Sequence, residues 1–124
     1  MIDRALFFAA RILIPSVFVG LGLERLLIFA RILPGPTVSA GAALFSALEL
    51  VAGLLVMIGW KLRWVASLLA VFILVDAFTA HPFWTYPAAE QHGQLLHFLK
   101  NLSTLGGLLL LVWMEGKLRS DRAS

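Results

Sequence analysis

The sequence contains no cysteine among its 124 residues. This absence excludes disulfides, thiolate metal sites, iron–sulfur clusters and thiol redox chemistry by the chain itself. Charged residues are also scarce, at 14% of the chain against 60% hydrophobic residues, whereas an average soluble domain has about 25% charged residues. So few charges cannot cover the surface of a 13.6 kDa globule. A soluble monomer is therefore excluded, and the mean hydropathy of +0.92 indicates an integral membrane protein.

The formal net charge of +3 does not indicate a nucleic-acid partner. The basic residues stand singly at the ends of apolar stretches, whereas a nucleic-acid-binding surface gathers them on one polar face. The partner that this composition predicts is the lipid bilayer.

Long apolar runs predict an all-α fold, a transmembrane four-helix bundle in a single domain over residues 1–124. A spanning helix needs about 20 mostly apolar residues, and four segments meet this requirement: residues 5–30, 38–59, 64–81 and 93–113. Breakers such as Pro34-Gly35-Pro36 separate them, because proline lacks the amide donor that a helix needs. Pro15 lies inside the first segment and predicts a kink near residues 11–15.

The distribution of Lys and Arg over the short connectors predicts the orientation. One side of the membrane would carry six basic residues and the other side one, Arg31. Because basic loops stay in the cytoplasm, both termini are predicted to be cytoplasmic. The six are Arg4, Lys61, Arg63, Lys117, Arg119 and Arg122.

Ionisable residues inside the predicted spans are the candidates for function. Each costs about 2.5–3.5 kcal/mol at a helix centre when it is unpaired. Helical spacing places most of them in the outer half of the membrane, on faces that carry small residues. The predicted polar site comprises Glu49, Asp76, His81, His97, Lys100 and Asn101. Glu24 and Arg25 are candidates for structural ion pairs.

Four short motifs resemble the DoxX family. They are Glu49-x-x-x-Gly53, the turn Gly59-Trp60-Lys61-Leu62-Arg63, His81-Pro82-Phe83-Trp84, and Phe98-Leu99-Lys100-Asn101-Leu102 followed by Gly106. The resemblance covers roughly residues 7–113. One departure lies at the end of the first span, where the family usually has Gly-x-x-Lys and this chain has Gly22-Leu23-Glu24-Arg25.

The resemblance to DoxX implies a multi-pass protein of a bacterial-type inner membrane. It also implies a membrane subunit of a quinone-linked redox system, with no intrinsic cofactor and with quinone as the bound group. Expected partners are other membrane or redox proteins, or further copies of the chain. Whether the chain is itself an enzyme stays open.

Several interpretations of the polar site remain open from the sequence. It could bind an anionic substrate or a quinone head group, with Lys100 attracting the anion and Glu49 or Asp76 accepting a proton. Alternatively, its charges form a structural pair that fixes helix register, or they face a partner in a non-enzymatic accessory subunit. A small proton-coupled transporter is a further alternative, and haem ligation by His81 and His97 is another. No local spacing indicates a metal site, so no metal ligand is predicted.

The predicted orientation can be tested with an epitope tag in sealed cells. A tag appended after Ser124 should resist external protease, whereas the same tag inserted after Thr85 should be removed, because the C-terminus is predicted to be cytoplasmic and the loop at residues 82–92 to face out, like the Pro-Gly-Pro turn. The opposite pattern would show that the basic residues do not set the orientation.

Overall fold

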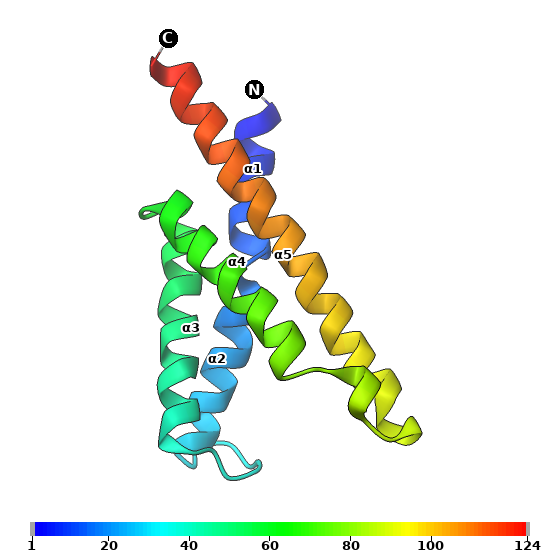
Figure 1. The fold of residues 1–124 in the computed structure, drawn as a ribbon. Coiled ribbons are helices and arrows are strands. Elements are labelled where there is room, and N and C mark those ends of the chain that lie inside the picture. The colour runs from blue at the N-terminus through cyan, green and yellow to red at the C-terminus, as the bar shows by residue number, and fades with distance from the viewer. Residues whose placement is uncertain (1, 124) are drawn as a thin grey trace. The chain divides into compact units, whose positions relative to one another are not determined.

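The structure, a computed structural model, describes residues 2–123 and consists of helices joined by short connectors, with no strand in that range (Figure 1). Four of its segments are long and apolar enough to cross a membrane: Arg4–Phe29, Ala40–Ile58, Leu62–Thr85 and Ala88–Ala123. The predicted all-α, multi-pass fold is confirmed. The helices are α1 (Ile2–Leu13), α2 (Ser16–Phe29), α3 (Ala40–Ile58), α4 (Leu62–Thr79) and α5 (Ala88–Ala123), with a short 3₁₀ helix, η1 (Phe83–Thr85), before α5.

The chain divides into two compact units, with the boundary between Val65 and Ala66 in the first turn of α4. The first unit contains α1, α2 and α3, and the second contains most of α4, then η1 and α5. The single domain over residues 1–124 stays a prediction, and each unit is described separately below.

Pro15 divides the first span into two helices. α1 ends at Leu13 and α2 begins at Ser16, since proline cannot donate the backbone hydrogen bond that a continuous helix requires. The Ser16 hydroxyl donates to the carbonyl of Leu13 at 2.6 Å, and the carbonyl of Pro15 accepts from the amide of Phe18 at 3.0 Å. The break therefore falls beside the predicted kink, and local hydrogen bonds satisfy its backbone groups.

Small residues let α2 and α3 approach each other closely. Gly22 on α2 and Gly53 on α3 are both buried, and a Cβ on Gly22 would lie 2.9 Å from the carbonyl oxygen of Ser46. Ser46 has no exposed surface, and its hydroxyl donates to the carbonyl of Ala42 at 2.9 Å. Contacts of this kind are how membrane helices gain van der Waals attraction where no hydrophobic force drives them together.

Arg11 stabilises the end of α3. Gly59 terminates that helix with φ 82°, and the amide of Trp60 donates back to the carbonyl of Leu55 at 3.0 Å. The Nε of Arg11 donates to the carbonyl of Met57 at 3.0 Å, so a cation lies where the helix dipole is negative. A Cβ on Gly59 would lie 2.7 Å from Nη1 of Arg11. The positive φ therefore favours glycine there, and any side chain would also have to displace the guanidinium of Arg11.

An aromatic cluster holds the turn of the second unit. The ring of Phe98 on α5 lies 5.3 Å from Phe78 of α4, 5.4 Å from Phe83 and 6.0 Å from Trp84. Phe83 and Trp84, both in η1, contact each other edge to face at 5.2 Å. Each such pair adds about 0.5–1.5 kcal/mol beyond the area it buries, so the cluster fixes the ends of α4 and α5 beside the turn.

The close approach of α2 and α3 predicts a difference between two glycines on the same helix. Gly22→Ala should lower the free energy of unfolding by about 1–3 kcal/mol, because the new methyl group meets backbone that cannot move aside. Gly20→Ala is the matched control, since a Cβ on Gly20 would have no atom of another residue within 4 Å. Denaturation of the purified chain by sodium dodecyl sulfate, followed by tryptophan fluorescence, measures both. Equal effects of the two substitutions would contradict the described contact.

Candidate functional site

Polar side chains from α4 and α5 meet beside the turn of the second unit. We call Asp76, His81, Gln94, His97 and Asn101 the Asp76 cluster. Nδ2 of Asn101 donates to Oδ2 of Asp76 at 2.8 Å, and the same carboxylate oxygen lies 3.7 Å from Nε2 of His81. The side chains of Asp76 and His81 are 33% and 25% exposed. The carboxylate is thus held in place while part of it stays accessible.

His81 contacts polar side chains from two elements. Its Nδ1 lies 2.8 Å from Oε1 of Gln94 on α5, and its Nε2 faces the carboxylate of Asp76 on α4. The tautomer of the ring decides which of its nitrogens donates. His81 therefore links the end of α4 to the first turns of α5.

His97 places a second imidazole against the first. The rings of His81 and His97 stack with centroids 4.9 Å apart and planes inclined by 26°. A haem held by two axial histidines has its iron and macrocycle between the rings, and stacking at this distance leaves no room for them. His97 is exposed, as is Lys100 one helical turn further along α5, so the cluster continues onto an open face of that helix.

Local sequence explains why these side chains converge. α4 ends at Thr79, and Pro82 starts η1 and prevents the helix from continuing through His81. The amide of Glu90 then donates to the carbonyl of Pro87 at 2.8 Å where α5 begins. The chain reverses over these few residues, which brings His81 back against the first turns of α5.

The structure brings together four of the predicted site residues: Asp76, His81, His97 and Asn101. Lys100 lies beside them on α5, and its participation stays a prediction. Glu49 belongs to α3 in the first unit, where it is half-buried, and its membership of the site also stays a prediction. Sequence reasoning missed Gln94, although it lies three residues before His97, on the same helical face.

Arg25 has a partner other than its neighbour Glu24. Its Nη1 donates to the hydroxyl of Ser46 at 3.4 Å, between α2 and α3. Adjacent residues on a helix face different directions, so an ion pair between Glu24 and Arg25 is not favoured by helical geometry. The contact that Arg25 makes is therefore with Ser46 of the next span, and a structural ion pair with Glu24 stays a prediction.

Among the described side chains, those of residues 4–123, no group of three or more His, Asp or Glu is arranged to hold a metal ion. The polar atoms of the Asp76 cluster are arranged instead for hydrogen bonding. Carboxylate, amide and imidazole groups can accept or donate toward a polar group that approaches the exposed side of α5.

The family model that matches this chain is that of the SURF4 family, over residues 3–122. No curated protein matches the chain, and no solved structure matches it.

The predicted DoxX membership is wrong, since the matching family is SURF4 and no DoxX model matches. The motifs behind that prediction have general physical causes. Basic turns and aromatic span ends occur wherever helices cross a membrane, and small residues recur wherever such helices touch. Quinone, a redox system and a bacterial inner membrane were implied by that resemblance, and they lose its support.

A double-mutant cycle tests the hydrogen bond at the centre of the cluster. Asp76→Ala and Asn101→Ala should each destabilise the chain, with a coupling energy of about 0.6 kcal/mol, the average found for hydrogen bonds between membrane helices. The control cycle pairs Asp76→Ala with Thr104→Ala, because the Thr104 hydroxyl donates within its own helix, to the carbonyl of Lys100. Coupling as large in the control cycle would contradict a direct Asp76–Asn101 bond.

Proposed function

This chain belongs to the SURF4 family of membrane proteins, and we propose that it acts as an integral membrane binding protein whose binding site is the Asp76 cluster. In this proposal the chain binds the polar group of a ligand at one end of α4 and α5. The observation that supports it most strongly is the partly exposed carboxylate of Asp76, held by Asn101 and facing His81.

A purely structural polar contact between membrane helices would be expected to enclose its polar atoms. Here the carboxylate and the first imidazole keep a quarter to a third of their surface exposed, and His97 and Lys100 are exposed beside them. A charged side chain left against lipid costs about 2.5–3.5 kcal/mol at a helix centre. A polar ligand that covers this face would reduce that cost.

The chemistry of the exposed side favours an anionic group. The ammonium of Lys100 has three donors, and the imidazole N–H of His97 can donate as well. Asp76 already accepts from Asn101, so its negative charge is partly compensated. A carboxylate or phosphate that approaches from the face of His97 and Lys100 therefore meets donors first.

A second candidate is an accessory subunit that packs against another membrane protein. The observation in its favour is the spacing of small and polar residues along α5, which recur every three or four positions at Gly93, His97, Lys100, Thr104 and Gly107. Such a stripe allows close helix contact, with polar members bonding across it. A carboxylate from the partner would then take the place of the ligand's anionic group.

The proposal is tested by isolating the full chain from native membranes in mild detergent and analysing proteins and small molecules together by mass spectrometry. We expect a component that co-purifies in fixed ratio with the wild type and is reduced about tenfold or more by Lys100→Gln or His97→Gln, because loss of a charged hydrogen bond costs about 1.5–3 kcal/mol. A small molecule supports the ligand site, and a protein supports the accessory subunit.

The control is Lys117→Gln, which removes a basic residue from the same helix outside the cluster. Its Nζ lies 5.4 Å from the ring centroid of Trp113, away from the Asp76 cluster in sequence by four helical turns or more. Loss of the component in this variant as well, or identical composition in all variants, would contradict a binding role for the cluster.

A further inference from the structure

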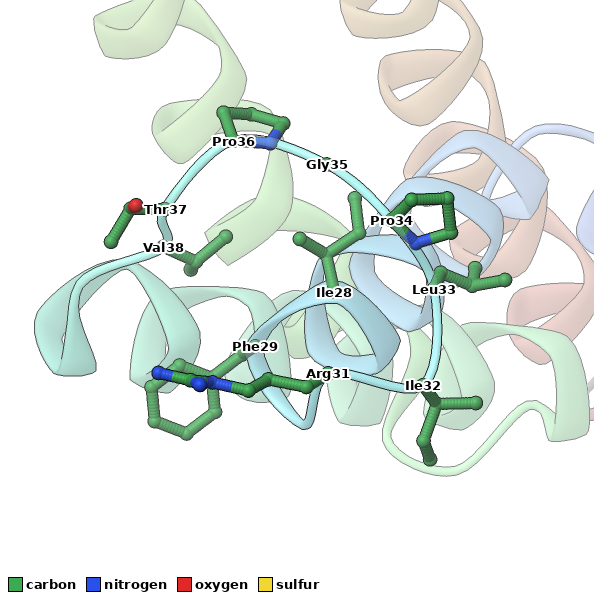
Figure 2. A pocket seen from close by; sticks show the side chains of 10 residues that line it. All are labelled: Ile28, Phe29, Arg31, Ile32, Leu33, Pro34, Gly35, Pro36, Thr37 and Val38. Carbon is green, nitrogen blue, oxygen red and sulfur yellow. The ribbon is translucent and has the colours of Figure 1, made fainter.

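The loop between α2 and α3 encloses an open cavity of about 580 Å³ (Figure 2). Its lining runs from Ile28, near the end of α2, to Val38, just before α3. Most of the lining side chains are apolar. Arg31 is the one charged residue among them, and Thr37 is the one with a hydroxyl. The volume lies within the range of about 300–1,000 Å³ that ligand pockets have.

The loop lies where the membrane surface is expected. The candidate span before it ends at Phe29, and the span after it begins at Ala40, so hydrocarbon gives way to polar headgroups along this loop. Phe29, Ile32 and Leu33 nevertheless expose much of their side chains, 69% in the case of Ile32. An apolar rim with a single cation at this level suits a molecule that is apolar at one end and anionic at the other.

Arg31 occupies a backbone position that normally takes glycine. Its φ is 61°, its amide donates to the carbonyl of Ile28 at 3.0 Å, and the amide of Ile32 donates to the carbonyl of Leu27 at 2.9 Å. These two bonds form a Schellman motif, whose left-handed residue is usually glycine because a Cβ is disfavoured there. Strained residues of this kind concentrate at ligand sites, and Arg31 is one of the residues that line the cavity.

The cavity is preformed by the loop. Figure 2 shows Ile28 inside the ring that residues 31–38 make, with Gly35 opposite it. A Cβ on Gly35 would lie 2.8 Å from Cδ1 of Ile28, so glycine lets the loop lie close against that side chain without displacing it. Pro34 and Pro36 fix their own φ on either side of it. A loop stiffened in this way loses little entropy when a ligand binds.

We infer that this loop binds a single anionic phospholipid, with the phosphate on Arg31 and an acyl chain against Ile32 and Leu33. The planar guanidinium matches a phosphate through paired hydrogen bonds. Thr37 also lines the cavity. The exposed side chains of Ile32 and Leu33 suit an acyl chain, which a soluble anion lacks. The site lies wholly in the first unit and does not depend on the function proposed for the Asp76 cluster.

The test counts the lipids that the full-length chain retains, by native mass spectrometry in detergent supplemented with phosphatidylglycerol or with phosphatidylcholine. Arg31→Gly should reduce retained phosphatidylglycerol about five-fold or more, while relaxing the backbone so that the chain still folds. Lys61→Gly is the matched control, because Lys61 is also a basic residue with positive φ, 44°, and does not line the cavity. Arg31→Lys, which keeps the charge, should retain more phosphatidylglycerol than Arg31→Gly.

We expect the wild type to prefer phosphatidylglycerol to phosphatidylcholine, and we expect excess inorganic phosphate to leave the bound lipid in place. Equal retention of the two lipids would overturn the assignment of an anionic ligand. Equal losses in the two glycine variants would show that basic residues attract lipid without a specific site. Displacement by inorganic phosphate would show that the cavity binds a free anion instead.

Discussion

The cost of an unpaired polar group in hydrocarbon is the constraint on which this structure depends. Backbone amides satisfy it inside the helices, and the side chains of the spans satisfy it through contacts between helices. Arg11 binds a carbonyl of α3, Arg25 binds the hydroxyl of Ser46, and Asp76 accepts from Asn101. Within the part of the chain that the structure describes, no buried side-chain nitrogen or oxygen lacks a hydrogen-bond partner. In the proposed function, a ligand would therefore bind the polar atoms of the Asp76 cluster that the chain itself leaves exposed.

Hydropathy and helix breakers were sufficient to predict the helices, because the tendency of a segment to enter the membrane is nearly a sum over its residues. The four spans follow from that sum. The interruption at Pro15 follows from the amide donor that proline lacks. Helical spacing also predicted that Asp76 and Asn101 belong to one site, since both lie on the turn-proximal halves of consecutive helices. It could not predict that Arg11 binds the carbonyl of Met57, because this contact depends on how two helices are rotated against each other.

The prediction of the family failed for a different reason. Membrane proteins of unrelated function share glycines at helix contacts, basic turns and aromatic span ends, because all of them have to fit a bilayer. They predicted a multi-pass membrane protein correctly and the DoxX family wrongly. Gln94 was missed for a related reason: a neutral amide near a span end carries little signal, although its Oε1 lies 2.8 Å from Nδ1 of His81.

The central claim is that the Asp76 cluster is an accessible binding site, and cysteine labelling tests its accessibility from water most directly. The chain has no cysteine of its own, so a water-soluble thiol reagent reports only the introduced residue in membranes. His97→Cys should react rapidly, since a thiolate forms only where water reaches it. Leu109→Cys, on an exposed apolar part of the same helix, should not react. If both positions are inert, the cluster is sealed from water, and the proposed binding site is contradicted.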